Sequence, residues 1–265
     1  MSAVELWTFV AVVGAGALFV ALERGLPYNR GQRLLRPGFW IDFVMYGFVQ
    51  SYVLGIVIGR VIQVLDAHTG LSRLGLMRGW PILGQLAFFV VTHDLYIYLF
   101  HRLQHGSLLL WRIHEAHHSV ANVDWLSGVR SHALEILINQ TVEFAPIVLL
   151  GAAPQVAVLK GAVSAIWGMF IHSNVDARLG WLRYVLNGPE MHRWHHATVP
   201  EAYGKNFSTK LAVWDWLFGT AYCPGSKAPR YGLSYTEYPE HFPGDYFVQQ
   251  AYAFRASTPL AAEIK

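Results

Sequence analysis

The chain has 265 residues, of which 14% are charged, and its mean hydropathy is +0.30. Soluble domains carry about 25% charged residues, so this composition argues against a soluble domain and favours an integral membrane protein. The formal net charge of +3 comes without a dense basic run, which makes nucleic acid a poor candidate partner. Cys223 is the single cysteine, which excludes an internal disulfide and a cysteine-ligated iron–sulfur cluster.

Apolar tracts recur along the chain from its beginning. Residues 6–22 and 43–59 are each 17 residues without a charge, close to the roughly 20 apolar residues that cross a bilayer. The third tract runs from 79 to about 100, and the fourth, 134–171, is interrupted by GAAP, which predicts a helical hairpin. The first tract lacks a preceding basic region, so we expect a retained anchor rather than a signal peptide. The sequence predicts an all-α, polytopic membrane protein with four or five transmembrane helices.

The distribution of arginine predicts the orientation of these helices. Four arginines lie between the first two tracts and none precedes the first, so the positive-inside rule places that loop in the cytoplasm. Counting crossings also places residues 101–131 and everything from 172 onward in the cytoplasm, because a hairpin returns to the face it left. Ten of the 13 histidines then gather in a cytoplasmic helical cap. Because AEIK at the C-terminus is not a dilysine retrieval signal, we expect a bacterial inner membrane location.

We expect one membrane-embedded domain over residues 1–265. Its predicted parts are N-terminal spans (1–78), a histidine-rich catalytic region (79–220) and a C-terminal tail (221–265). The tail is rich in tyrosine, glycine and proline, and we expect it to lie at the membrane interface, where aromatic rings settle.

Two copies of an HxxHH motif lie on either side of the predicted hairpin, HEAHH at 114–118 and HRWHH at 192–196. Residues i, i+3 and i+4 share one face of a helix, so each copy points three imidazoles in one direction. At this frequency of histidine, one HxxHH is expected by chance about 0.03 times. A third box, HRLQH at 101–105, places two more histidines at i and i+4.

The number and type of these side chains favour a pair of metal ions. Three boxes supply eight imidazoles, and His172, which closes the hairpin, makes nine at one membrane face. One zinc ion takes four ligands, so this number suits two metals. Nitrogen-only ligation disfavours magnesium and calcium, and a redox metal with open positions favours iron and oxygen chemistry.

An alternative function arises within the first box. His114, Glu115 and His118 have the HExxH spacing of zinc metalloproteases, in which the glutamate is the general base. In the second box Arg193 stands where Glu115 stands in the first, so only the histidines repeat, which favours HxxHH as the pattern. A non-catalytic metal or haem carrier is a third interpretation, but it predicts paired axial histidines on facing spans.

The segments DLYIYLFHRLQH (94–105), HEAHH, HSNV (172–175) and HRWHH, in this order around a hydrophobic hairpin, resemble the fatty acid hydroxylase/sterol desaturase superfamily of membrane di-iron oxygenases. The resemblance covers roughly residues 80–220. It implies two Fe²⁺ ions and O₂-dependent hydroxylation or desaturation of a C–H bond in a fatty acyl, sterol or related membrane lipid. The family's metal ligands map onto His101, His105, His114, His117, His118, His172, His192, His195 and His196.

The resemblance also implies an external electron donor, either a cytochrome b5-like protein, a ferredoxin or a flavoprotein reductase. An imidazole cage has no preference for iron, and the Irving–Williams order places zinc above ferrous iron. We therefore expect Zn²⁺ to replace iron in purified protein.

Four further polar residues are candidates for roles beside the metals. Asp176 occupies a position where some relatives carry another histidine, so it could be a tenth ligand. His132 is expected to support the ligands or to be structural. Asp94 lies on the same helix face as His101 and could accept its N–H. His93 lies within the third tract, where a hydrogen bond to a neighbouring helix is the expected use.

Overall fold

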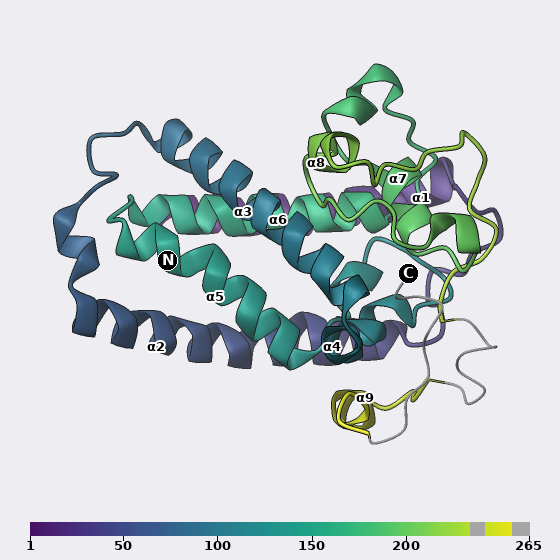
Figure 1. Ribbon diagram of the computed structural model, residues 1–265, viewed down its shortest axis with the longest axis horizontal. Coiled ribbons are helices and arrows are strands. Elements are labelled where there is room, and N and C mark those ends of the chain that lie inside the picture. The colour runs from purple at the N-terminus through teal and green to yellow at the C-terminus, as the bar shows by residue number, and fades with distance from the viewer. Residues whose placement is uncertain (234–241, 256–265) are drawn as a thin grey trace.

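The structure, a computed structural model, describes residues 1–233 and 242–255 (Figure 1). In this part of the chain the secondary structure is helical, and no β-strand occurs. The all-α prediction is therefore confirmed.

Four helices are long and apolar enough to cross a membrane: Ala3–Gly25, Ile41–Thr69, Ile82–Gly106 and Pro154–His172. They are α1, the continuous pair of π-helix η1 (Ile41–Gln50) and α2 (Ser51–Thr69), α3, and α6. The 17-residue helix α5 (Ala133–Leu149) precedes α6 and forms the predicted hairpin with it. The prediction of four or five spans is confirmed.

Local sequence signals set the ends of these helices. Ser2 and Glu5 form a capping box at the start of α1, in which each side chain bonds the backbone N–H of the other residue. Gly70, with φ of 63°, ends α2 in the left-handed conformation that glycine adopts without strain. Pro154 begins α6 at a position where its missing N–H costs no hydrogen bond.

The turn between α5 and α6 packs against the loop between α2 and α3 at one end of the bundle (Figure 1). The Met77 N–H donates to the Leu150 carbonyl at 3.0 Å. Gly151 has φ of 67°, and a Cβ there would lie 2.8 Å from the Gly75 Cα, so the close approach of the two loops requires glycine. This contact holds the turn of the α5–α6 hairpin at the end of the bundle where α2 connects to α3.

The opposite end of the bundle carries the short helices. They are α4 (Leu108–His118), α7 (Pro189–His195), α8 (Val213–Leu217) and α9 (Tyr246–Tyr252), with 3₁₀ turns η3 (Ser127–Val129), η4 (Gly180–Tyr184) and η5 (Pro200–Ala202) between them. The remaining 3₁₀ turn, η2 (Leu71–Leu74), belongs to the hairpin-turn end. All three histidine boxes therefore lie at one end of the bundle, as the hairpin argument predicts.

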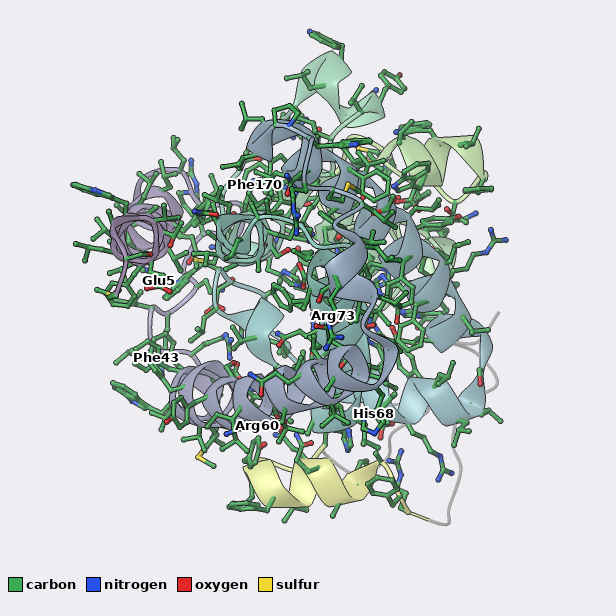
Figure 2. The ribbon with its side chains drawn as sticks, turned by 90° about the vertical axis from the view of Figure 1, so that its left-hand side faces the viewer. Glu5, Phe43, Arg60, His68, Arg73 and Phe170 are labelled. Atoms are coloured by element: carbon green, nitrogen blue, oxygen red, sulfur yellow. The ribbon has the colours of Figure 1, made fainter. Side chains whose placement is uncertain are left out.

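The outer surface of the long helices is apolar. Figure 2 looks along the bundle from the hairpin-turn end and shows α1 and α2 with side chains projecting outward. Trp7 and Phe9 on α1 are 69% and 63% exposed, and Tyr52 on α2 is 73% exposed. Such a surface is stable against lipid rather than water.

The C-terminal tail is partly helical. Its helix α9 docks on η1, where Tyr46 Oη donates to Gln249 Oε1 at 2.6 Å and Tyr246 Oη donates to Gln50 Oε1 at 2.8 Å. Phe247 and Phe254 are 70% and 68% exposed, as expected for interfacial anchors. The predicted tail also includes residues 234–241 and 256–265, which lie outside the described residues.

Candidate metal centre

The nine predicted histidines come together in two adjoining groups. Within each group, the nitrogen atoms that could bind a metal all lie within 4.8 Å of one another. The first group is His101, His105, His114, His118 and His195, and the second is His117, His172, His192 and His196.

The two HxxHH boxes divide between the groups in opposite ways. On α4, His114 and His118 belong to the first group and His117 to the second. In the second box, His192 and His196 belong to the second group, and His195 belongs to the first. Because i and i+4 side chains stack along a helix face while i+3 is offset, each short helix contributes to both groups.

Hydrogen bonds at the outer edge of the cluster orient the rings. Nδ1 of His101 donates to the Phe207 carbonyl at 2.7 Å, and Nδ1 of His117 donates to the Arg130 carbonyl at 3.0 Å. His172 and His195 make the same contact with the carbonyls of residues 168 and 205, both at 2.8 Å. A carbonyl oxygen only accepts, so Nδ1 carries the proton and Nε2 presents a lone pair to the interior.

The inward nitrogens converge at distances that fit metal ligands. Nε2 of His101 lies 3.0 Å from Nε2 of His114, and Nε2 of His172 lies 2.9 Å from Nε2 of His192. Two ligands at right angles on a metal at about 2.1 Å would be roughly 3.0 Å apart. His105 Nε2 is buried without a hydrogen-bond partner. Converging lone pairs repel one another unless a cation lies between them, so the donor set fits two metal ions.

Burial keeps the imidazoles of the short helices neutral. Desolvation lowers the pKa of His114 to about 3 and that of His117 to about 4, and it also holds the pKa values of His118, His192 and His196 below the usual range. Neutral imidazole is the form that binds a metal. The site is therefore in its ligating state at neutral pH.

Glu135 supplies the buried carboxylate beside the cluster. Its Oε1 accepts from Nδ1 of His114 at 2.8 Å and from the amide of Gln104 at 3.0 Å, and its Oε2 has no partner. Neutral ligands would leave the charge of two bound dications uncompensated, and this carboxylate would offset part of it. Glu135 was not among the residues predicted from the sequence; the available signal was an acidic residue in the first turn of the hairpin, three residues after His132.

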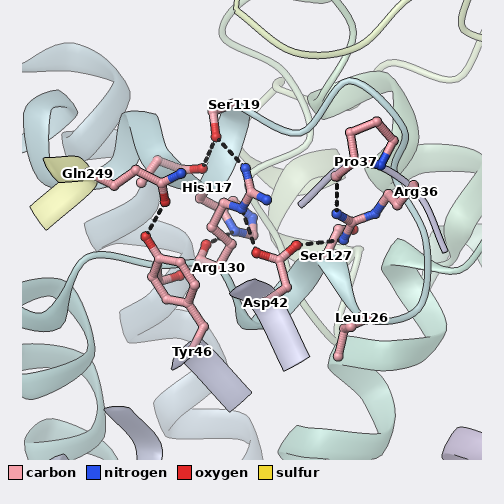
Figure 3. A network of polar contacts seen from close by, with 12 residues as sticks. Arg36, Pro37, Asp42, Tyr46, His117, Ser119, Leu126, Ser127, Arg130 and Gln249 are labelled. Carbon is pink, nitrogen blue, oxygen red and sulfur yellow. Dashed lines mark hydrogen bonds and ion pairs between the residues drawn. The ribbon is translucent and has the colours of Figure 1, made fainter. Parts of the chain in front are cut away.

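A four-charge network fixes the chain that leaves α4 (Figure 3). Asp42 on η1 accepts from Arg130 Nε at 2.6 Å and from Arg36 Nη2 at 2.7 Å. Arg36 also bonds both carboxylate oxygens of Asp124, at 2.8 and 3.0 Å. The Arg130 carbonyl is the acceptor of His117, so this network positions a ring of the second group. The contacts that join Arg36 to Asp124 and Asp42 to Arg130 each span 88 residues, and no local pattern predicted them.

Asp94 acts on the metal centre through a loop. Its carboxylate accepts from Thr209 Oγ1 at 2.7 Å and from the backbone N–H groups of Lys210 and Leu211 at 2.9 and 2.8 Å. It therefore clamps the segment that begins with Phe207, whose carbonyl accepts from His101. Asp94 was a candidate acceptor for the His101 N–H; the structure gives that hydrogen bond to the Phe207 carbonyl instead.

Glu115 points away from the histidine cluster. Both of its carboxylate oxygens accept from the guanidinium of Arg255, at 2.5 and 3.0 Å, and the residue is 1% exposed. It belongs to neither of the two histidine groups. The third element of the HExxH interpretation is therefore absent from the site.

The other candidate residues lie outside both groups. Asp176 is exposed and pairs with Lys227 at 2.8 Å, so the structure does not bring it to the histidines as a tenth ligand. His132 caps α5, and its Nε2 donates to the Gln250 carbonyl at 2.9 Å, which docks α9. His93 lies 3.2 Å from Lys160 Nζ on α6, the expected bond to a neighbouring helix.

A cavity of about 200 Å³ adjoins both groups of histidines. It lies among α3, α5 and α6, and His101, His114, His117, His172 and His192 all line it. The cavity extends along the bundle as far as His93, two helical turns before His101. A molecule bound in it would contact the edge of the metal centre.

Residues 86–220, about half of the chain, match the family model of the fatty acid hydroxylases. The chain belongs to the fatty acid hydroxylase family. The matched region begins in α3 and ends after α8, so it contains all nine converging histidines. No solved structure matches the chain.

The chain is similar to curated proteins with several different names. It is 37% identical to an ornithine lipid hydroxylase of Rhizobium tropici over 55% of this chain and 44% of that protein. It is 30% identical to the human alkylglycerol monooxygenase over 54% of this chain and 31% of that one. A very-long-chain aldehyde decarbonylase of Oryza sativa is 28% identical over 68% of this chain and 66% of its own length. The chain thus spans less than half the length of the first two proteins.

Proposed function

We propose that this protein oxidises a C–H bond of a membrane lipid with O₂ at a pair of ferrous ions held by its nine clustered histidines. The observation that carries the proposal is the convergence of two groups of neutral imidazoles on one cavity at the end of an apolar helix bundle. Relatives named as an ornithine lipid hydroxylase and alkylglycerol monooxygenases support a lipid substrate.

The iron pair would supply the capacity to reduce O₂ and activate it toward a C–H bond. The protein's own groups hold the site in the state this chemistry needs. Backbone carbonyls fix the tautomers of four histidines, and Glu135 offsets positive charge beside His114. Helices α3, α5 and α6 enclose the reacting region and limit the access of water.

Hydroxylation is the outcome that the relatives' names favour. The overall reaction is R–H + O₂ + 2 e⁻ + 2 H⁺ → R–OH + H₂O, so an electron donor is required. The described part of the chain has one cysteine, Cys223, and cannot hold a cysteine-ligated cluster. We propose a cytochrome b5-like protein, a ferredoxin or a flavoprotein reductase as the donor. Desaturation would start from the same C–H bond and is the alternative outcome.

We also propose that the histidine end faces the cytoplasm of a bacterial cell, where such donors are found. Single cysteines placed at the α3–α4 junction (106–107) and in the segment 197–204, in a Cys223→Ser background, should be labelled from the cytoplasmic side. Labelling of the two segments from opposite sides would contradict the shared site, and labelling of both from outside would reverse only the orientation.

The experiment that tests the function separates metal from activity. Protein purified in air should contain up to two zinc ions per chain and be inactive. Anaerobic reconstitution with Fe²⁺ and a reductant should restore oxidation of membrane lipids, seen by mass spectrometry as a gain of one oxygen. Activity with zinc alone, or saturation at one metal per chain, would refute the di-iron proposal.

A further inference from the structure

We propose that the lipid binds across two adjoining cavities, with its hydrocarbon chain in an apolar one and its polar end in the one beside the metals. The carbon that is oxidised then adjoins the polar end of an amphiphile rather than lying in the middle of an acyl chain. This inference rests on the proposed function and narrows its substrate class.

The apolar cavity is the larger of the two, about 420 Å³. Helix α1 packs against α6, and α2 packs against α5 (Figure 2). The cavity lies between these two pairs of helices. Val12, Phe144 and Met169 line it, and among the described residues of its wall only Glu143 is charged. Ser51 and Ala165 in the same wall are exposed on the outer surface. A hydrocarbon chain could enter this space from the bilayer without leaving an apolar environment.

The cavity beside the metals has a different character. Besides five histidines of the metal centre, its wall contains the charged residues Glu135, Glu143 and Lys210 and the amides of Gln104 and Asn139. Glu135 Oε2 has no hydrogen-bond partner. Methylene groups placed here would leave Glu135 Oε2 without solvent or a partner, which costs free energy. A polar end with hydroxyl, amide or amine groups would satisfy it.

The two cavities share a wall at which the polarity changes. Gly128, Glu143, Ser164 and Gly168 line both. Here Glu143 accepts from Lys160 Nζ at 2.5 Å and from Ser164 Oγ at 2.6 Å. Ionisable groups within membrane helices are rare and mark binding or transport sites. Glu143 lines both cavities and therefore lies at the boundary between polar and apolar walls that an amphiphile would need.

Glycine keeps this boundary open. A Cβ on Gly168 would have nothing within 4 Å, so a larger side chain there would project into free space at the shared wall. Gly128 differs, because a Cβ on it would lie 2.7 Å from Nδ1 of His172 and would displace that ring. Gly168→Leu therefore narrows the junction, and its Cβ would have no atom of the metal centre within 4 Å. It also retains the backbone carbonyl that accepts from His172.

The seating of the chain can be tested without activity, on the zinc-loaded protein in phosphatidylglycerol vesicles. The probe is a fatty acid with a photoactivatable diazirine in the middle of its chain. Peptide mapping should find the crosslinks at Phe144 or Met169, which line only the apolar cavity. Crosslinks at Ile97 or Phe100, which line only the cavity beside the metals, would overturn the proposal.

The junction is tested with Gly168→Leu and a matched control, Gly55→Leu. Gly55 lies on the exposed side of α2, also has nothing within 4 Å of its Cβ, and lines neither cavity. Crosslinking should fall by about tenfold in Gly168→Leu and stay at the wild-type level in the control, with both proteins retaining two metals. Wild-type crosslinking in Gly168→Leu would contradict passage through the junction.

With the iron-loaded enzyme, fragmentation of the product should place the new oxygen next to the polar end of the lipid. Oxygen in the middle of the chain would refute the seating but leave the proposed function intact. Absence of any lipid oxidation would instead refute the proposed function, and the crosslinking result would still decide where a chain binds.

Discussion

Glu115 and Arg255 form a two-point ion pair, with the guanidinium donating to both carboxylate oxygens at 2.5 and 3.0 Å. The glutamate therefore holds the C-terminal segment instead of facing a metal. We expect Glu115→Gln to retain most of the lipid oxidation activity and to lose about 1–3 kcal/mol of stability, because a buried charge-assisted bond is weakened. Activity and thermal unfolding of the same preparation check this. Loss of activity equal to that of His114→Ala would favour the zinc protease.

The division of the histidines predicts separable metal sites. His114→Ala removes a member of the first group and His192→Ala a member of the second. Each variant should lose lipid oxidation and bind about one metal per chain, since a site that loses one of its few ligands is the first to empty. His68→Ala is the control, because His68 is exposed at the end of α2. Elemental analysis that finds two tightly held metals in both variants would show that these residues are not ligands.

Glu135→Gln keeps the shape of the side chain but removes its charge. We expect metal affinity or activity to fall by about 10- to 100-fold, the usual effect of removing a partner that orients a metal-bound histidine. Competition with a chelator measures the affinity. Glu201→Gln, at an exposed position in η5, provides the control. An affinity and activity equal to those of the wild type would mean that the carboxylate contributes nothing to the centre.

Asp42 lies between two buried arginines, and its loss should be costly. Asp42→Asn leaves Arg36 and Arg130 with incomplete charge compensation at positions that are 3% and 6% exposed. We expect a loss of about 3–5 kcal/mol in the free energy of unfolding. Asp176→Asn, which breaks a surface pair with Lys227, should cost at most about 1 kcal/mol. Similar losses in the two variants, measured by denaturation in detergent, would contradict the role assigned to the network.

The metal-free protein should become less stable in mild acid. The pKa values of His114 and His117 are lowered to about 3 and 4 in the folded state, from 6.5 in an unfolded chain. Between these limits the unfolded state binds more protons, so stability is retained above pH 6.5 and lost as the pH falls below it. The expected loss is about 1.4 kcal/mol per histidine for each pH unit. A midpoint of thermal unfolding that is constant from pH 7 to pH 5 would contradict this.

The histidines were predictable because their spacing encodes local geometry. Residues such as His114 and His118 meet on a helix face whatever the rest of the fold does, and the apolar hairpin returns His192 to the same end of the bundle. Which histidine joins which group depends on how α4 and α7 face each other, and that is a tertiary property. The spacing keeps His118 with His114 and sets His117 apart, but no sequence pattern says which histidine of the second box joins each of them.

The carboxylates considered near the histidines show what local spacing does not predict. Asp176 was expected near the metals because some relatives carry a histidine at this position, four residues after His172. The chain, however, leaves α6 at Ser173, and the carboxylate turns outward to Lys227. Glu135 takes the place near the cluster that such a carboxylate would have. Local spacing predicts a side chain's neighbours only while the helix continues.

The sharing of α4 and α7 between the two groups also constrains the order of biosynthesis. A ribosome makes α4 long before α7, yet neither group is complete until residue 195 or 196 has been added. The hairpin of α5 and α6 must therefore enter the membrane before either metal can be fully bound. Neither ion could act as a template for insertion of the helices that precede α7, and metal binding would be a late step in biosynthesis.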